Sequence, residues 1–301
     1  MRNRRLFQPD GLWLMTLAAS TWGTIGVATQ AIYQIDTTTS LFINLARMLV
    51  ATPVLLLICW RMVGPRMFNV QRRDLLLMLI AGGLLAISQA AYFAAIRYTG
   101  VTITTLLTIC IAPVVVMGLS VLLRLEKMTG RLLASLGCAL VGSVLLVGFS
   151  SADLTQDQLV TGTLFSLIAA GSYAGTIICG RFLAAHYHAL QITTISFFGG
   201  TLLLAAINLA SGIVAVHTVE SWLLIVYLGL VPTAFAYWLF QAGLRSVSAV
   251  AASIVSMLEP LVATLLAWAL FGETLAASGV IGAGLLILSI TLLSRTSDQP
   301  A

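Results

Sequence analysis

The sequence predicts an all-α integral membrane protein that crosses the bilayer ten times, built as two inverted repeats of five helices. Composition, a series of long apolar segments and the distribution of basic residues between these segments predict this fold. Of the 301 residues, 59% are hydrophobic and only 8% are charged. Soluble domains carry about 25% charged residues. A water-soluble fold and a disordered or nucleic-acid-binding chain are therefore excluded, and the lipid bilayer is expected to cover most of the surface.

Ten apolar segments are long enough to span a membrane, for which a helix needs about 20 residues. They cover residues 11–31, 41–61, 74–96, 102–123, 131–149, 160–180, 190–211, 221–243, 248–270 and 276–294. No linker between them is long enough for a soluble domain. The basic start of the chain resembles a signal peptide, but apolar segments continue to the end, so we expect the first helix to be retained.

The basic residues alternate with the segments as the positive-inside rule requires. With the N-terminus in the cytoplasm, 13 of the 15 basic residues fall on the cytoplasmic side: Arg2, Arg4, Arg5, Arg61, Arg66, Arg72, Arg73, Arg124, Lys127, Arg131, Arg181, Arg245 and Arg295. The outer loops contain Arg97 and five acidic residues: Asp36, Asp153, Asp157, Glu220 and Glu273. A wrong number of spans would scramble this alternation. We therefore expect ten helices with both termini in the cytoplasm.

The two halves of the chain resemble each other. Pro113 matches Pro260, and Glu126 matches Glu273, at the same offset along the chain. Because each half has five spans, the second copy inserts upside down relative to the first. Inverted repeats give many transporters their inward-facing and outward-facing states, with the substrate near the midplane. We expect one repeat over residues 1–150 and the other over residues 151–301.

The same residues resemble a known family. Leu258-Glu259-Pro260, the later Phe271-Gly272-Glu273-Thr274 and the early Trp22-Gly23 are similar to the signature of EamA domains. These domains belong to the drug/metabolite transporter superfamily, in which two tandem copies give ten helices. Overall, the chain looks most like bacterial inner-membrane exporters of aromatic amino acids. The first half departs from the pattern, because Ala112 stands where the second half has Glu259.

The resemblance implies a multi-pass protein of the bacterial inner membrane with a central cavity. Spans 1, 3, 4, 6, 8 and 9 would line this cavity, and spans 5 and 10 would lie at the periphery. Span 5 fits this placement, because Ser135, Ala139 and Ser143 form a face of small residues suited to close helix contact. Gly279 and Ala283 form a similar face in span 10.

Glu259 is the first candidate for a functional residue. A carboxylate in a membrane span costs about 2.5–3.5 kcal/mol on insertion scales, so it should face the bundle interior or a wet cavity. There it would bind a substrate amine, couple transport to protons, or serve only as a structural partner for a neighbouring helix. Pro113 and Pro260 interrupt backbone hydrogen bonding in matching spans, so we expect them to act as hinges of the moving helices.

Polar and aromatic side chains form a second group of candidates, in stripes at helical spacing. Span 3 and span 8 each carry one stripe: Ser88, Gln89 and Tyr92, and Tyr237, Trp238 and Gln241. Trp22 in span 1 and its repeat mate Tyr173 in span 6 lie deeper than interfacial aromatic residues. Such side chains suit an aromatic or amphipathic substrate. Packing between helices is the alternative for all of them.

Arg47 lies within the second span, where it would reach the membrane surface, pair within the bundle, or hold a substrate carboxylate if it faced the cavity. No GxxxxGK[ST] nucleotide-binding loop and no catalytic or metal-ligand constellation is found in the sequence. We therefore expect a monomeric, cofactor-free secondary transporter of small molecules, favouring aromatic amino acids, and not an enzyme. A multidrug or other metabolite exporter and a non-transporting membrane subunit are the alternatives.

Overall fold

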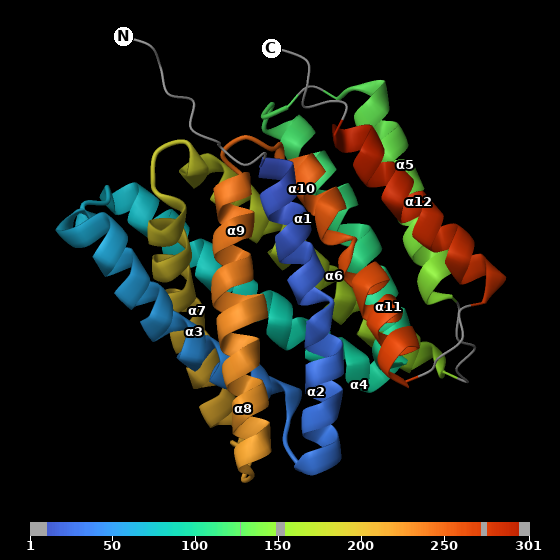
Figure 1. Cartoon of the computed structure of the whole chain (residues 1–301), viewed down its shortest axis with the longest axis horizontal. Helices are drawn as coiled ribbons and strands as arrows, with labels where there is room; N and C mark the ends of the chain where they lie inside the picture. The colour runs from blue at the N-terminus through green and yellow to red at the C-terminus, as the bar shows by residue number, and fades with distance from the viewer. Residues whose placement is uncertain (1–10, 127, 149–153, 272–275, 295–301) are drawn as a thin grey trace.

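A computed structural model describes residues 11–126, 128–148, 154–271 and 276–294. Gly272, Glu273 and Thr274 of the signature lie outside the described residues, as do the boundary between the expected repeats and the basic residues of the first ten positions. All regular structure in the described part of the chain is helical. The helices form one bundle, in which α1 begins and α12 ends at the same end of the molecule (Figure 1).

The helices run in this order: α1 (Gly11–Trp22), α2 (Thr24–Ile35), α3 (Ser40–Val63), η1 (Gly64–Phe68), α4 (Arg72–Leu122), α5 (Gly130–Val147), α6 (Gln156–Ala184), α7 (Ala189–Ser211), α8 (Val219–Leu228), η2 (Gly229–Phe235), α9 (Ala236–Gly243), α10 (Ala249–Ser256), α11 (Glu259–Phe271) and α12 (Ala277–Ser294). Helix η1 is a 3₁₀ helix and η2 is a π-helix that contains Pro232. Because π-helical turns are rare and frequently occur at functional sites, η2 marks the middle of its span as a place of interest.

Eight helical stretches of the described residues are long and apolar enough to cross a membrane. The sequence predicts ten, and the difference arises at two places. Residues 11–35 form two short helices, α1 and α2, because the helix is interrupted at Gly23. Residues 72–122 form one continuous element, α4, although two spans are expected there.

Helix α4 folds back on itself at Gly100. A straight helix of its 51 residues would be about 77 Å long, more than twice the hydrocarbon thickness of about 30 Å. Gly100 has φ 74° and ψ 171°, which a glycine adopts readily because it lacks a Cβ atom. The hydroxyl oxygens of Tyr92 and Thr105 lie 2.6 Å apart across this turn. In a straight helix, these residues would be about 20 Å apart, so α4 has two antiparallel arms.

Two interrupted helices meet at their breaks. The α1–α2 break lies at Gly23, and the α10–α11 break lies at Met257 and Leu258. A Cβ atom on Gly23 would lie 2.9 Å from the carbonyl oxygen of Glu259 and 2.6 Å from Cβ of Val262. Only a glycine permits this approach, and it brings Trp22 next to the start of α11.

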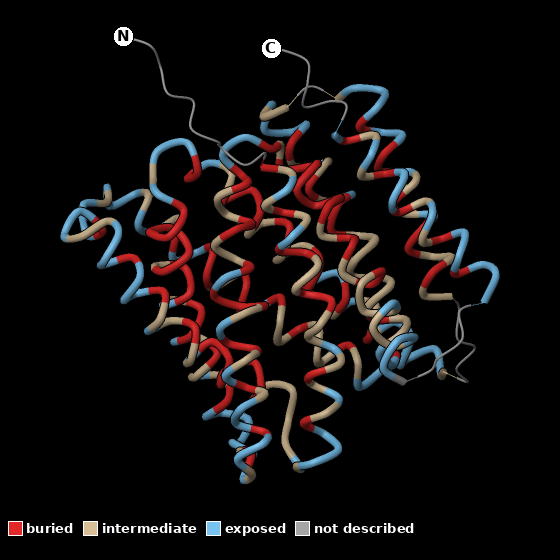
Figure 2. The backbone as a smooth tube through the Cα atoms, in the orientation of Figure 1, coloured by how far each residue is buried: buried red, intermediate tan, exposed pale blue. Residues whose placement is uncertain are grey.

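Buried residues concentrate along the inner faces of the central helices (Figure 2). The largest apolar cluster joins α1, α4, α5, α6, α9, α10, α11 and α12. A second cluster joins α3, α4 and α7. Many large apolar side chains remain exposed on the outside of the helices, as expected where lipid replaces water.

Helices α5 and α12 form a pair at the edge of the bundle (Figure 1). The hydroxyl of Ser135 donates a hydrogen bond to the carbonyl oxygen of Ser289 at 2.8 Å. A Cβ atom on Gly282 would lie 2.5 Å from the carbonyl oxygen of Gly142. The two helices therefore pack closely through small residues, which include Ser135 of the expected face, and the expected peripheral position of spans 5 and 10 is confirmed.

Loops from the two halves are joined at each end of the bundle. At one end, the Asp36 carboxylate accepts hydrogen bonds from the Thr218 hydroxyl at 2.6 Å, the Thr218 amide at 3.1 Å and the His217 amide at 3.3 Å. At the other end, the Tyr187 hydroxyl donates to Asp74 at 2.6 Å, and this hydrogen bond raises the pKa of Tyr187. In each case, a loop following the first span of one half reaches the start of the third span of the other half.

Candidate functional site

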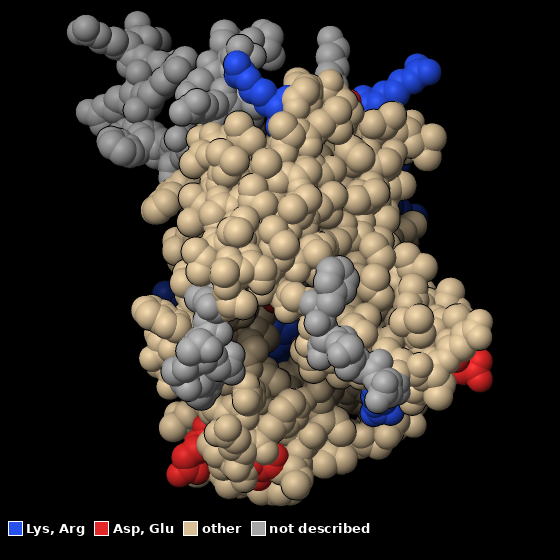
Figure 3. All heavy atoms as spheres, turned by 90° about the vertical axis from the view of Figure 1, so that its right-hand side faces the viewer, with Lys and Arg blue, Asp and Glu red and all other residues tan. Residues whose placement is uncertain are grey.

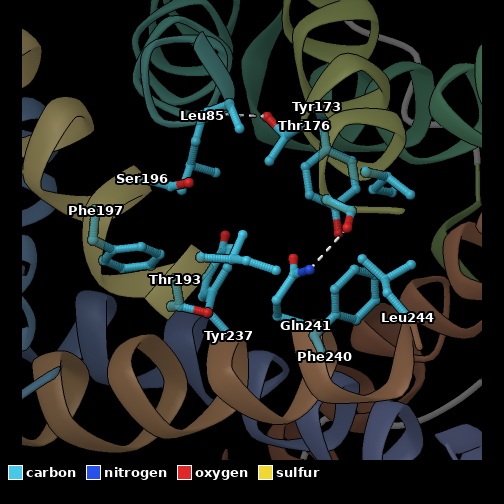
Figure 4. Close-up of a pocket in the computed structure, with 14 residues that line it drawn as sticks. Leu85, Tyr173, Thr176, Thr193, Ser196, Phe197, Tyr237, Phe240, Gln241 and Leu244 are labelled. Carbon is cyan, nitrogen blue, oxygen red and sulfur yellow. Dashed lines mark hydrogen bonds between the residues drawn. The ribbon is translucent and has the colours of Figure 1, made fainter. Parts of the chain in front are cut away.

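A cavity lies in the bundle between α4, α6, α7 and α9 (Figure 4). Its volume is about 40 Å³, measured as the space open to the centre of a water molecule, which is room for a few waters. Fourteen residues line it: Ala81, Leu85, Tyr173, Thr176, Ile177, Gly180, Ile192, Thr193, Ser196, Phe197, Tyr237, Phe240, Gln241 and Leu244. An amino acid or a drug is larger than this space. The helices must therefore separate before such a solute can enter.

Three of the expected site residues line this cavity. Tyr237 and Gln241, four residues apart, lie on the same face of α9, and Tyr173 lies opposite on α6 (Figure 4). The Gln241 side-chain amide donates a hydrogen bond to the carbonyl oxygen of Gly180 at 2.9 Å and thereby joins α9 to α6. This bond closes the cavity on one side.

Helix α7 contributes a wall that the expected set of lining spans omits. Ser196 and Phe197 come from this helix, and the Phe197 ring centre lies 5.1 Å from that of Tyr237 in an edge-to-face arrangement. The set of lining spans is therefore incomplete. Apolar residues cover much of α7, so its sequence does not distinguish a cavity-lining face from a lipid-facing one.

Trp22 joins this aromatic group from α1. It is 4% exposed, and its ring centre lies 5.0 Å from that of Tyr237 and 5.1 Å from that of Phe240. Its indole N–H has no hydrogen-bond partner among the described residues. Buried polar groups are normally paired, so this unpaired donor is available to a solute or a water molecule.

Glu259 lies in the first turn of α11, where the positive end of the helix dipole stabilises a carboxylate. The charge of Glu259 acts on the phenol groups of Tyr92, Tyr173 and Tyr237. These tyrosines belong to three different helices. Glu259 and the tyrosines therefore form one electrostatic site at the centre of the bundle, around the break between α10 and α11.

The remaining expected residues have other surroundings. The Ser88 hydroxyl donates to the carbonyl oxygen of Ala169 at 2.8 Å and so joins α4 to α6. Trp238 packs edge-to-face against Phe235, with ring centres 6.0 Å apart. Gln89 is partly exposed in the first arm of α4. None of Ser88, Gln89 and Trp238 lines the described cavity, and their binding role stays a prediction.

The two prolines expected to act as hinges differ in their settings. Pro260 is the second residue of α11, directly after the break, where its missing N–H disturbs no helical hydrogen bond. Pro113 lies inside the second arm of α4, which continues as a helix on both sides of this residue. The matched sequence positions are thus a helix start in one half and a helix interior in the other. Their hinge role stays a prediction.

Three further residues belong to this region. Phe240 follows Tyr237 by three residues on α9, and this spacing is the signal by which it could have been found. Phe197 has no such signal beyond being aromatic in the middle of a span. Arg47 in α3 is buried and interacts electrostatically with Glu259 and with the hydroxyl of Tyr237. The sequence left its orientation open.

The surface of the molecule is hollowed on the side shown in Figure 3, and basic side-chain atoms are visible inside the hollow. The fold and the site together define a polytopic membrane protein with interrupted helices around an aromatic, charged centre. The profile of the EamA-like transporter family matches residues 10–148 and 160–295. The chain therefore belongs to the EamA family, with two EamA domains, and is a transporter of the drug/metabolite superfamily and not an enzyme.

Similar proteins carry transporter names. The chain is 29% identical to "Uncharacterized transporter YwfM" of Bacillus subtilis over 92% of this chain and 91% of the relative. It is 27% identical to "Uncharacterized inner membrane transporter YicL" of Salmonella typhimurium over 97% of both chains. A transporter of Archaeoglobus fulgidus is 31% identical over 68% of this chain and 72% of the relative.

A solved structure titled "Crystal structure of protein" has the same fold. It superposes with a TM-score of 0.78 over 97% of this chain and 100% of that chain, at 17% sequence identity. At this identity, the likeness concerns the fold alone.

Proposed function

We propose that this protein is a secondary transporter that exports amino acids, aromatic ones above all, and related metabolites across the bacterial inner membrane. The observation that carries the proposal is the aromatic site with unpaired polar groups at the centre of the bundle. Trp22, Tyr237 and Phe240 form a surface suited to an aromatic ring. The unpaired indole N–H of Trp22 and the nearby charges suit a polar amino-acid backbone.

We further propose ten spans, arranged as inverted repeats over residues 1–150 and 151–301. Two features support this number. The hairpin turn of α4 at Gly100 makes two spans of one element, and α1 and α2 together have the length of one span. The paired loop contacts at the two ends of the bundle, Asp36 with Thr218 and Tyr187 with Asp74, support an inverted relation between the halves.

The proposed orientation places both termini in the cytoplasm. In Figure 3, basic side chains project from the upper end, where α1 begins and α12 ends in Figure 1, and most of the acidic side chains in view lie toward the lower end, where a basic side chain is also visible. This separation is the one that the positive-inside rule describes. A monomer is the proposed transport unit, because the cavity lies within one chain and between its own helices.

Alternating access requires the small cavity to open in turn to the two sides. The hydrogen bond from Gln241 to Gly180 and that from the Arg181 guanidinium to the Leu244 carbonyl oxygen, at 2.7 Å, hold α6 against α9 at the proposed cytoplasmic end. These bonds must break when the cavity opens to the cytoplasm. The helix breaks at Gly23 and before Pro260 are the proposed points of bending.

The test is transport by purified protein in liposomes loaded in turn with phenylalanine, tryptophan, threonine, lysine and a cationic dye, with and without a pH gradient. We expect saturable flux of phenylalanine and tryptophan. Movement of the dye and none of the amino acids would favour the multidrug alternative. The absence of any flux, in protein shown to be folded, would favour a non-transporting subunit.

Variants of two tyrosines test the position of the site. We expect Tyr237→Ala and Tyr92→Ala to lower the flux at least about tenfold, because each removes a large central ring whose loss costs more than about 1.4 kcal/mol. Tyr33→Ala, which changes an exposed tyrosine, is the control and should transport like wild type. Full flux in both central variants would place the site elsewhere.

A further inference from the structure

Arg47 is the only lysine or arginine that is buried among the described residues, with 5% of its surface exposed. Its Nε and Nη1 atoms have no hydrogen-bond partner in the described part of the chain. A guanidinium offers five N–H donors in a rigid fork and stays charged in proteins. Burying such a group without partners is costly, so its presence about two turns inside α3 requires an explanation.

The surroundings of Arg47 connect it to the transport site. Glu259 and the hydroxyl of Tyr237 interact electrostatically with Arg47, and Tyr237 lines the central cavity. No hydrogen bond joins Arg47 to Glu259 within the described residues, and Glu259 is itself only partly buried. Met48, the neighbour of Arg47 in α3, packs in one apolar cluster with Leu85 and Phe197, which line the cavity. Arg47 and Glu259 are therefore groups of opposite charge in the same region of the bundle, without a hydrogen bond between them among the described residues.

Close contacts with glycines hold the backbone at Arg47 and at Glu259. A Cβ atom on Gly229 would lie 2.9 Å from the Arg47 carbonyl oxygen and 2.7 Å from Cβ of Val50, so η2 holds α3 closely. A Cβ atom on Gly23 would lie 2.9 Å from the Glu259 carbonyl oxygen, so the α1–α2 break holds the start of α11. Packing thus positions each charge from a different element, independently of an ion pair between them.

We infer that Arg47 binds the carboxylate of a zwitterionic α-amino acid and that Glu259 binds its ammonium group. This inference rests on the proposed function and adds to it the chemistry by which the substrate is selected. Two N–H groups of the guanidinium match the two oxygens of a carboxylate. The substrate ring then lies against the rings of Trp22, Tyr237 and Phe240, which surround the same centre.

The site selects its substrate because a solute that lacks either charged group leaves one protein charge unpaired. A solute without a carboxylate leaves Arg47 buried and unpaired, and a solute without an amine leaves Glu259 unpaired. Free amino acids should therefore bind better than their esters or the corresponding amines. A site that merely attracts aromatic cations would prefer the amine and the ester instead.

The experiment uses the full chain, purified and reconstituted, with phenylalanine, phenylalanine methyl ester and phenethylamine as probes. Binding is measured by isothermal titration, and transport by counterflow of labelled phenylalanine. We expect wild type to bind phenylalanine at least about tenfold more tightly than the ester or the amine, which is the size of effect that the loss of one partner of a buried charge pair produces.

Variants assign this preference to the guanidinium. Arg47→Gln should lose at least about tenfold in affinity for phenylalanine and keep its affinity for the ester, whereas Arg47→Lys should retain part of the preference. Arg61→Gln removes an exposed arginine near the end of the same helix and should bind all three probes like wild type. Retained ester binding shows that Arg47→Gln is folded. Loss of all three probes in Arg47→Gln, in protein that melts like wild type, would contradict a role of Arg47 that is specific to the carboxylate.

Three further results overturn the inference, and they separate it from the proposed function. In the first, Arg47→Gln transports phenylalanine and still prefers it to the ester and the amine; the exporter proposal then stands, and Arg47 does not belong to the site. In the second, wild type binds phenylalanine, the ester and the amine equally well; the exporter proposal again stands, and the proposed recognition of both charged groups is wrong. A wild-type protein that neither binds nor moves any amino acid overturns both proposals.

Discussion

Asp36 lies in the loop between α2 and α3, where it accepts hydrogen bonds from His217 and Thr218, which directly precede α8. Interactions with the side chains of Ser221 and Thr218 lower the pKa of Asp36 from 3.8 to about 2. A carboxylate whose pKa is lower in the folded state contributes stability above its unfolded pKa and loses it as the pH falls through the folded pKa. The contribution of Asp36 is therefore complete above about pH 3.8 and lost as the pH falls to about 2.

The variant Asp36→Asn keeps the size of the side chain and removes its charge. We expect a lower melting temperature than wild type at pH 7, and a difference that shrinks between pH 4 and pH 2, because wild-type Asp36 is then protonated as well. Thermal unfolding in detergent across this pH range is the measurement. Asp157→Asn, an exposed acidic residue in the first turn of α6, is the control. Equal melting temperatures of Asp36→Asn and wild type at pH 7 would contradict the expectation.

Close contact between glycines decides how α5 and α12 pair. The carbonyl oxygen of Gly142 and the amide nitrogen of Leu146 occupy the space that a Cβ atom on Gly282 would need, at 2.5 Å and 2.6 Å. Gly284, two residues along the same helix, has nothing within 4 Å of the corresponding position. Both glycines lie within α12, but only Gly282 faces the backbone of α5 at close range. Comparing alanine variants of the two therefore distinguishes the effect of packing from that of helix propensity.

We expect Gly282→Ala to destabilise the folded protein by about 1–3 kcal/mol, the usual cost of overpacking, because both obstructing atoms belong to backbone and cannot turn away. Gly284→Ala should be neutral or slightly stabilising, because alanine favours a helix. Thermal unfolding of both variants, purified in the same detergent, makes the comparison. A Gly282→Ala protein as stable as Gly284→Ala would show that α5 and α12 do not approach this closely.

The arrangement of the whole molecule in the membrane depends on the inverted relation of its halves. The α6–α7 loop and the α7–α8 loop lie at opposite ends of the bundle, at either end of α7. The proposed orientation puts the first loop in the cytoplasm and the second outside. His186 and His217 are exposed residues of these loops and suit labelling.

In a variant with Cys59, Cys110, Cys138 and Cys179 replaced by serine or alanine, single cysteines at these two positions report the orientation. We expect His217→Cys to react with a membrane-impermeant maleimide in intact spheroplasts. His186→Cys should react only after the membrane is opened. Labelling of His186→Cys and not His217→Cys in intact spheroplasts would show the opposite orientation in the membrane. Labelling of both from outside would contradict an odd number of membrane crossings between the two loops.

Local sequence patterns determined which segments are helical, that they lie in a membrane, and that Ser135 belongs to the face by which span 5 packs. The spacing of Tyr237 and Gln241 also predicted that they share one face of a helix, and both line the cavity from α9. A helix that is long and apolar enough is stable in lipid without help from its neighbours, because its backbone hydrogen bonds lie within the helix. Both properties can therefore be read from each segment alone.

Only the tertiary structure decided which way each helix faces. The Ser88 hydroxyl bonds to the backbone of α6, Phe197 lines the cavity, and Arg47 is buried with its Nε and Nη1 atoms unpaired among the described residues. The tertiary structure also broke the helix before Glu259, where the contact with Gly23 holds the chain. The physical reason is that lipid tails are as apolar as the bundle interior, so hydrophobicity exerts little force on helix rotation. Close packing and the pairing of polar groups set the rotation, and both depend on neighbours from distant parts of the chain.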